Sequence, residues 1–295
     1  MKLLVIHGGV GLSQEADISE LSGRQVIEAA KTAGLDVTEF KLTKDNLEDL
    51  KSQLKTYDVV FPVLHGHFGE DGGIQKILED AGVRYVGSDI TASQLCFDKP
   101  NTQHQLKSVG ITVPEFRIIT SPDQFQDAWL PCVIKPPQGG SSVDTFVWKT
   151  TSELEKLSEL FTRHNSLMVE QYIQGREFTV GILNGEALPI IEIIPPQDGW
   201  FNYENKYSGA SQEIVNPELS LNISTEMKQL AVRAYQVCGC RHLARVDFIL
   251  LDHQPVCLEI NTMPGFTAES LYPKAAAAIG YDPPTLVKKL IELAL

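Results

Sequence analysis

Four polar side chains stand inside two apolar, strand-like segments near the end of the chain. Arg245 and Asp247 are two residues apart in the first segment. Glu259 and Asn261 are two residues apart in the second. Side chains with this spacing share one face of a β-strand, and ionised groups buried there need a counter-charge or a metal ion. Oxygens of this kind suit Mg²⁺, especially with nucleotide phosphates in the shell, but a buried Arg245–Asp247 ion pair that only organises the sheet is equally compatible.

A lysine followed by a glycine–serine loop is the second candidate. Lys135 ends a buried strand-like run, and the loop Gly139-Gly140-Ser141-Ser142 follows it. Such a loop can bring backbone N–H groups and an ammonium group to a phosphate. It is not a Walker loop, because no Gly-Lys-Ser or Gly-Lys-Thr opens a following helix. The alternative is a plain hairpin turn beside a surface lysine.

Three further segments bear on a site. Residues 168–177 form a strand–turn–strand pattern that could bind a flat base and a ribose, or an ordinary β-turn centred on Gly175. His65 and His67 have no third His or Cys nearby, which predicts one pocket histidine and one loop histidine rather than a zinc site. The loop 195–211 is rich in aromatic and charged residues and has the length of a lid.

The elements that would position these groups follow a clear order in the first ninety residues. Strands separated by helices predict a parallel sheet with crossover helices, an α/β layer. Its ligand crevice would lie beyond the carboxyl ends of the strands, where Gly8-Gly9 and the segment 64–73 fall. The expected strands are Leu3–His7, Asp36–Lys41 and Asp58–Leu64, and the expected helices are Asp17–Ala33, Asn46–Leu54 and Gly73–Ala81.

A second unit begins near Asp98, which suits a helix N-cap with Pro100 in the first turn. From Leu167 onward the pattern is rich in strands. The expected strands of this part are Glu115–Ile119, Cys132–Lys135, Asp144–Val147, Leu167–Tyr172, Glu177–Leu183, Leu188–Ile194, Leu243–Leu251 and Val256–Thr262. The expected helices are Ser152–Arg163, Thr225–Val237 and two more at the end.

The composition limits the class of protein. The 295 residues are 43% hydrophobic, and 25 Lys+Arg against 38 Asp+Glu leave a formal net charge of −13. This charge argues against nucleic acid or an anionic membrane as a partner, but not against a small anion held by a few clustered cations. No apolar run approaches the roughly 20 residues of a membrane span, and the N-terminal run predicts a strand rather than a signal peptide. Five cysteines, an odd number, predict buried free thiols in the cytoplasm.

Taken in order, the motifs resemble the ATP-grasp superfamily and, within it, the D-alanine–D-alanine ligases of bacterial cell-wall synthesis. The resemblance covers essentially the whole chain. The motifs that carry it are Leu64-His65-Gly66, Gly69-Glu70-Asp71-Gly72, Tyr85-Val86-Gly87-Ser88, Asp98-Lys99, Val133-Ile134-Lys135-Pro136, Gly140-Ser141-Ser142-Val143, Glu177-Phe178-Thr179-Val180, Leu243-Ala244-Arg245-Val246-Asp247-Phe248, Glu259-Ile260-Asn261-Thr262-Met263-Pro264-Gly265-Phe266-Thr267 and Ser270-Leu271.

The resemblance implies an α/β ATP-grasp fold with ATP held between its central and C-terminal units. An N-terminal Rossmann-like domain with a parallel sheet is expected over residues 1–95 and would bind substrate. A small central α+β domain would span residues 96–175. A C-terminal α+β domain would span residues 176–295 and carry the metal site and the lid loop.

The same resemblance implies a role for each candidate residue. The catalytic set is Glu15, Ser141, Tyr207, Arg245 and Gly265, of which Arg245 and the Gly265 N–H would stabilise the oxyanion. The nucleotide-binding set is Lys99, Lys135, Ser142 and Lys206 for the phosphates, Glu170, Gln171 and Ile173 for the adenine, and Glu177 for the ribose. The metal ligands are Asp247, Glu259 and Asn261. The substrate-binding set is Glu15, His65, Arg245, Ser270 and Leu271.

The implied reaction joins two D-alanine molecules at the expense of ATP, through a D-alanyl phosphate, and releases ADP and phosphate for peptidoglycan synthesis. Phosphoryl transfer needs charge neutralisation and alignment more than a nucleophile, which accounts for the lysines and metals. Two Mg²⁺ ions are expected, with Mn²⁺ able to substitute. The expected partners are D-alanine, ATP and a second copy of the chain in a homodimer.

The chain also departs from the family pattern. Gln138-Gly139 replaces the commoner Arg-Glu pair, Phe201 falls where tyrosine is frequent, and the segment 8–13 is longer than usual. Asp144 stands where glycine is usual, so we expect an extra carboxylate to alter loop mobility or phosphate affinity. The alternatives are a D-Ala–D-Ser or D-Ala–D-lactate ligase, and a nucleotide-binding protein without ligase activity. Tyr207 favours a dipeptide product.

Overall fold

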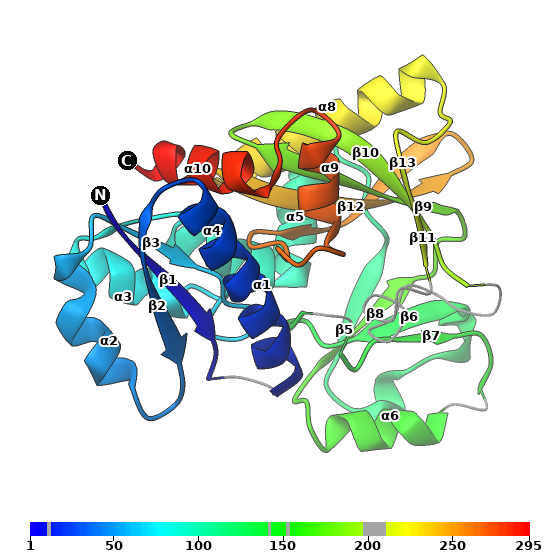
Figure 1. The fold of residues 1–295 in the computed structure, drawn as a ribbon. Coiled ribbons are helices and arrows are strands. Elements are labelled where there is room, and N and C mark those ends of the chain that lie inside the picture. Colours follow the sequence, from blue (N-terminus) through cyan, green and yellow to red (C-terminus); the bar gives the residue numbers. More distant parts are fainter. Residues whose placement is uncertain (11–12, 141–142, 152–153, 197–210) are drawn as a thin grey trace.

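Three sheets with helices packed around them make up the computed structural model (Figure 1), which describes residues 1–10, 13–140, 143–151, 154–196 and 211–295. The first sheet comes from the N-terminal part, the second from the middle and the third from the C-terminal part of the chain. One sheet is parallel and two are antiparallel, which confirms the expected α/β class.

The N-terminal sheet is parallel and has the order β2-β1-β3-β4. Its central strand β1 is buried on both faces, as expected for a parallel sheet covered by helices: Leu3 packs into one apolar cluster and Leu4 into another. The elements of this part are β1 (Lys2–Gly8), α1 (Ser13–Thr32), β2 (Asp36–Leu42), α2 (Leu47–Gln53), a short 3-10 helix (Leu54–Thr56), β3 (Val59–Pro62), α3 (Gly73–Ala81) and β4 (Arg84–Tyr85).

Two consecutive helices, α4 (Ile90–Phe97) and α5 (Lys99–Ser108), lead from the first sheet to the second. The predicted cap of α5 is confirmed, because the Asp98 side chain accepts a hydrogen bond from the N–H of Asn101 at 3.0 Å. Helix α4 was not expected from the sequence, although Asp89 caps it in the same way. Both helices pack against β13 of the third sheet, so the junction of the first two units rests on the third.

The central sheet is antiparallel and has the order β5-β8-β6-β7. The strand expected from Asp144 begins only at Phe146, because Asp144 has a φ of 52°, outside the extended region. The elements of this part are β5 (Phe116–Ile119), two 3-10 turns (Pro122–Gln124 and Asp127–Trp129), β6 (Cys132–Lys135), β7 (Phe146–Trp148), α6 (Leu154–Phe161) and β8 (Leu167–Gln171).

The C-terminal sheet is antiparallel and has the order β11-β10-β9-β12-β13. Since β8 and β9 belong to different sheets, residues 172–175 connect two sheets and are not the turn of a hairpin. Helix α8 begins four residues earlier than expected, at Leu221, because Ser220 caps it by accepting from the Ile223 N–H. The elements are β9 (Arg176–Leu183), β10 (Glu186–Ile194), β11 (Gln212–Val215), α8 (Leu221–Val237), β12 (Leu243–Leu251) and β13 (Gln254–Asn261).

The last two helices, α9 (Leu271–Ala277) and α10 (Pro283–Ala294), return to the start of the chain. Helix α10 lies beside α1 and the first sheet (Figure 1), and its Leu286 and Leu290 share one apolar cluster with Leu3 and Val5 of β1. The two ends of the chain therefore build one core. In the part of the chain that the structure describes, no helix is long and apolar enough to cross a membrane.

Candidate active site

Two cavities meet at the junction of the three sheets. The first, of about 540 Å³, is lined by residues of all three parts of the chain, and the second, of about 400 Å³, by residues of the central and C-terminal parts. The cavities share a neck formed by Lys99, Gly139, Gly140 and Glu259, which line both. Molecules bound in the two cavities can therefore contact each other at this neck.

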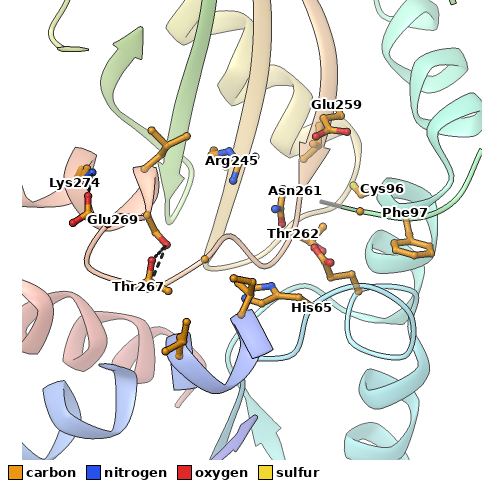
Figure 2. Close-up of a pocket in the computed structure, with 18 of the residues that line it drawn as sticks. His65, Cys96, Phe97, Arg245, Glu259, Asn261, Thr262, Thr267, Glu269 and Lys274 are labelled. Carbon is orange, nitrogen blue, oxygen red and sulfur yellow. Dashed lines mark hydrogen bonds and ion pairs between the residues drawn. The ribbon is translucent and has the colours of Figure 1, made fainter. Parts of the chain in front are cut away.

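Strands β12 and β13 supply the polar face between the cavities. Asp247 lies opposite Glu259 and Arg245 opposite Asn261. Cross-strand partners share one face of a sheet, so the four polar residues that the sequence predicts as two pairs form one group. Figure 2 shows Arg245, Asn261 and Glu259 extending from these strands, with His65 across the cavity.

A β-bulge creates this juxtaposition. The register shifts by one residue after Asp247, which leaves Leu258 without a partner in the ladder. Without the shift, Cys257 and Glu259 would lie on one face, since side chains alternate along a strand. With it, Cys257 packs in the apolar cluster beneath the sheet together with Phe248, whereas Glu259 reaches the cavities.

Arg245 and Asp247 form a two-point ion pair. The Arg245 Nε lies 2.9 Å from Asp247 Oδ1 and Nη2 lies 2.7 Å from Oδ2, and Thr179 donates its hydroxyl to Oδ1 at 2.6 Å. The ion pair considered as an alternative is thus present, but it stands beside Glu259 and Asn261 and faces the cavities. Because Asp247, Glu259 and Asn261 offer only oxygen donors, the group fits a hard divalent cation such as Mg²⁺.

The second cavity contains a buried lysine–glutamate pair. Lys135 Nζ lies 2.8 Å from Glu170 Oε2, and Gln103 donates its amide to Oε1. Both charged side chains are less than a tenth exposed. The ion pair with Glu170 therefore fixes the position of the Lys135 ammonium group. Gln171, Ile173 and Glu177, expected at the adenine and ribose, line the same cavity.

Lys99 stands at the neck at the first residue of α5. Its ammonium donates to the Gly139 carbonyl, and its backbone N–H donates to the Pro137 carbonyl at 3.0 Å. Burial lowers the pKa of the Lys99 ammonium, while the negative charge of Glu259 opposes that shift. These contacts tie the start of α5 to the loop that precedes Gly140.

Glu70 lines the first cavity, and the buried carboxylate of Glu15 lies close to it beside Gly140. A Cβ placed on Gly140 would lie 3.5 Å from Oε1 of Glu15 and 3.7 Å from Oε2 of Glu70, and one on Gly66 would overlap the Glu15 carboxylate. Burial raises the pKa of Glu15. Burial also raises the pKa of Glu70, to about 8, although Glu70 accepts a hydrogen bond from the Gly66 N–H. A side chain at Gly66 would therefore displace the Glu15 carboxylate, whereas one at Gly140 would make only ordinary contact with it.

His65 lies in the loop after β3 and lines the first cavity, whereas His67 is exposed beside Asp71. Burial lowers the pKa of His65 to about 4, so its ring is neutral near pH 7. Within the described ranges, no three His, Cys, Asp or Glu side chains form a group that could hold a metal. The two histidines thus occupy the two different environments that the sequence predicts.

The far wall of the first cavity comes from residues that precede and open α9. Gly265, Ser270 and Leu271 all line it, and the Ser270 hydroxyl accepts from the Thr267 N–H at 3.0 Å. A Cβ on Gly265 would lie 2.7 Å from Ser270 Oγ, so a side chain there would displace the hydroxyl. The predicted second-substrate residues therefore face the same space as Arg245.

Some predicted site residues cannot be placed. Ser141, Ser142, Lys206 and Tyr207 lie outside the described residues. The same holds for residues 197–210 of the expected lid loop, including Phe201. The roles expected for these residues stay predictions.

Three residues that contact the site residues are not predicted from the sequence. Glu70 was noted only as part of a motif, and Gln103 and Thr179 received no role. Thr179 lies two residues after Glu177 on β9, which places both on one face, so alternation along that strand could have indicated it. Gln103 and Glu70 gave no such signal, because tertiary packing alone brings them to Glu170 and Glu15.

Comparison with known proteins agrees with this geometry. The family described as "D-ala D-ala ligase C-terminus" matches residues 105–292, and "D-ala D-ala ligase N-terminus" matches residues 42–88. The chain is 39% identical over its whole length to the D-alanine–D-alanine ligase of Pseudothermotoga lettingae, which it covers completely. The chain belongs to the D-alanine–D-alanine ligase family. The ligase of Thermotoga maritima is 40% identical over the whole chain and 97% of its own length.

Solved structures of the ligase family have the same fold. The chain superposes on the D-alanine–D-alanine ligase of Bacillus anthracis complexed with ATP with a TM-score of 0.86 at 31% identity, covering all of this chain and 96% of the other. For the D-alanine–D-alanine ligase of Coxiella burnetii the TM-score is 0.85 at 27% identity, covering all of this chain and 93% of the other. These similarities support the expected ATP-grasp fold of this ligase-family chain.

Proposed function

We propose that this chain joins two D-alanine molecules into D-alanyl-D-alanine with conversion of ATP to ADP and phosphate, for peptidoglycan precursor synthesis. The observation that carries the proposal is the neck between the two cavities. One cavity presents the residues expected for a nucleotide and the other those expected for two amino acids, and Lys99 and Glu259 line both. The shared lining places a nucleotide phosphate in the second cavity next to a substrate carboxylate in the first.

The first step transfers the γ-phosphoryl group of ATP to the carboxylate of the first D-alanine, which gives D-alanyl phosphate and ADP. This step concentrates negative charge at the neck, where Lys99 contributes positive charge, and Lys135 adds a second cation in the nucleotide cavity. Glu15 holds the ammonium of the first D-alanine. The ammonium groups of the two lysines neutralise part of the negative charge of the phosphates. Glu15 holds the amino acid in line with the transferred phosphoryl group.

In the second step the amine of the second D-alanine attacks the acyl carbonyl, the carbon–nitrogen bond forms, and phosphate leaves. Arg245 and the N–H of Gly265 stabilise the oxyanion of the tetrahedral intermediate. Ser270 and Leu271 receive the carboxylate of the second substrate. The ion pair with Asp247 orients the Arg245 guanidinium toward this space.

A divalent cation belongs to this chemistry. Asp247, Glu259 and Asn261 would hold two Mg²⁺ ions, with Mn²⁺ able to substitute, and the ions would supply charge neutralisation for the phosphates. The support is the set of oxygen ligands that these three residues present to the two cavities, with Glu259 lining both.

The adenine would contact the segment of Glu170, Gln171 and Ile173, and the ribose would contact Glu177. Ser141, Ser142 and Lys206 would contribute to the phosphate site. Tyr207, at the position where the dipeptide-forming ligases carry tyrosine, would select D-alanine over D-lactate. These assignments follow from the family resemblance and, for the hinge residues and Glu177, from their position in the second cavity.

We place the protein in the cytoplasm as a homodimer of three domains, residues 1–95, 96–175 and 176–295. Five free, buried cysteines support a reducing compartment. Each of the three sheets falls within one of these ranges. Light scattering that gives the 32.6 kDa of a single chain would contradict the dimer.

One assay tests the reaction. Purified protein receives ATP, Mg²⁺ and D-alanine, with D-lactate or D-serine added in parallel. We expect D-alanyl-D-alanine by mass spectrometry and one phosphate released per dipeptide. An absence of turnover would contradict the ligase function, and turnover only with D-lactate or D-serine would contradict the substrate assignment.

A further inference from the structure

Asp144 adopts a backbone conformation that glycine tolerates far better. Its φ of 52° lies in the left-handed region, where a non-glycine residue is strained, although Asp is among the residues that enter it most readily. Its neighbours on both sides, Val143 and Thr145, line the second cavity. The strain therefore falls within the wall of the proposed nucleotide site.

Two basic side chains, a histidine and an arginine, hold the Asp144 side chain. His164 Nε2 lies 2.7 Å from Asp144 Oδ2, and Arg163 Nη2 lies 3.0 Å from Oδ1. The carboxylate is about one-fifth exposed, so these contacts are only partly screened by water. The guanidinium of Arg163 therefore balances the extra negative charge expected from the sequence, and neither Arg163 nor His164 lines the second cavity.

The anchor point is rigid. Arg163 and His164 follow α6, and the backbone N–H groups of both donate to the Leu160 carbonyl at 3.0 Å. Leu160 is buried in the apolar cluster of the central domain with Trp148 of β7. The contact therefore ties the loop before β7 to the same core on which β7 itself rests.

We propose that Asp144 is a positioning residue for the nucleotide: its contacts with His164 and Arg163 fix Val143 and Thr145 as the wall of the second cavity. The inference rests on the proposed function, because it assumes that this cavity binds ATP. A glycine at this position leaves the loop free to sample many conformations, and ordering it on binding costs affinity. Aspartate replaces that freedom with an ionic anchor.

Three substitutions separate the anchor from the backbone. Asp144→Asn keeps a residue that tolerates the left-handed region but removes the charge, Asp144→Gly removes strain and anchor together, and His164→Gln removes one partner. We expect each to raise the Kd for a non-hydrolysable ATP analogue about fivefold or more, as an increase in KM for ATP with kcat and the KM for D-alanine nearly unchanged. Isothermal titration measures the Kd without turnover.

A matched control and a double variant complete the test. Glu159→Gln removes another acidic neighbour of Arg163, an exposed side chain of α6 whose Oε1 lies 3.6 Å from Arg163 Nη1. This variant should leave the Kd unchanged. In a double-mutant cycle, Asp144→Asn with His164→Gln should cost little more than either alone. An unchanged Kd in Asp144→Asn and His164→Gln, with only a lower Tm, overturns the proposal and leaves the ligase function intact. Wild-type protein that binds no nucleotide contradicts the function itself.

Discussion

At the scale of single residues, Glu15 and Glu70 illustrate how burial gives two neighbouring carboxyl groups different tasks. Lys99 and His67 lower the pKa of Glu15 against the effect of burial. The hydrogen bond from the Gly66 N–H and the charge of Arg245 also lower the pKa of Glu70, but burial outweighs them and raises its pKa to about 8. Near pH 7 Glu70 therefore carries a proton, while Glu15 is the better placed of the two to balance a substrate ammonium.

Glu70→Gln should be tolerated, because glutamine has the shape and charge of a protonated glutamate and can still accept from the Gly66 N–H. We expect kcat/KM for D-alanine at pH 7 within about threefold of wild type. Glu15→Gln, the matched variant, removes the charge that pairs with the ammonium and should raise the KM for D-alanine at least about tenfold. Initial-rate kinetics that show equal losses for both would contradict this division of roles.

Lys135 and Glu170 should depend on each other for stability. Glu170→Gln leaves the Lys135 ammonium buried with no full counter-charge, and we expect a loss of about 3–5 kcal/mol in urea unfolding. The double variant Lys135→Met/Glu170→Met should recover most of that stability without recovering turnover, because an apolar pair fills the space but cannot bind phosphate. Recovery of turnover in the double variant would exclude Lys135 from phosphate binding.

Residue types and spacing predict many of the site residues, but not which of their side chains contact one another. The alternation in β12 and β13 indicates that Arg245 shares a face with Asp247 and Glu259 with Asn261. Both Glu259 and Cys257 can take their observed faces only because of the bulge at Leu258. No local sequence pattern marks this bulge, because it results from the packing of Cys257 in the apolar cluster. The pairing of Glu170 with Gln103 is likewise a consequence of how α5 packs on β13.

At the scale of elements, capping determines where helices begin. Apolar periodicity predicts a helix from Thr225, but the helix starts at Leu221 because the Ser220 hydroxyl satisfies an exposed N–H. Helix α4 escaped prediction for a related reason. It is nearly continuous in apolar and small residues between Asp89 and Asp98, and therefore shows no amphipathic period.

Ser220→Ala should lower the free energy of unfolding by about 1 kcal/mol, because α8 loses its N-cap. Ser220→Asp should retain stability, since aspartate caps as well as serine does. Ser224→Ala, one turn later on the exposed side, should change stability by less than about 0.5 kcal/mol. Urea unfolding measures all three, and activity should stay at the wild-type level because α8 does not line either cavity.

At the scale of the whole molecule, His242 connects the first sheet to the third. It precedes β12, and its Nδ1 accepts from the Gly87 N–H at 3.0 Å. Burial lowers the pKa of His242 from 6.5 to about 4, so the folded protein favours the neutral ring. The stabilisation is complete above the unfolded pKa of 6.5 and is lost as pH falls from there toward 4.

We therefore expect wild-type protein to lose more stability between pH 7 and pH 4.5 than His242→Asn does. Asparagine tolerates the φ of 62° at this position and does not titrate, so the difference between the two proteins isolates the histidine. Urea unfolding at several pH values gives this difference directly. Parallel pH curves for the two proteins would contradict the role of His242.

The core shared by both ends of the chain has a consequence for synthesis on the ribosome. Leu3 and Val5 of β1 reach their final packing only when Leu286 and Leu290 of α10 are present. Residues translated first must wait for residues translated nearly last, and until then α1 alone covers that face of the first sheet. The N-terminal part of this chain should therefore mature after release, while the central sheet, whose apolar cluster draws only on residues 119–169, can form during translation.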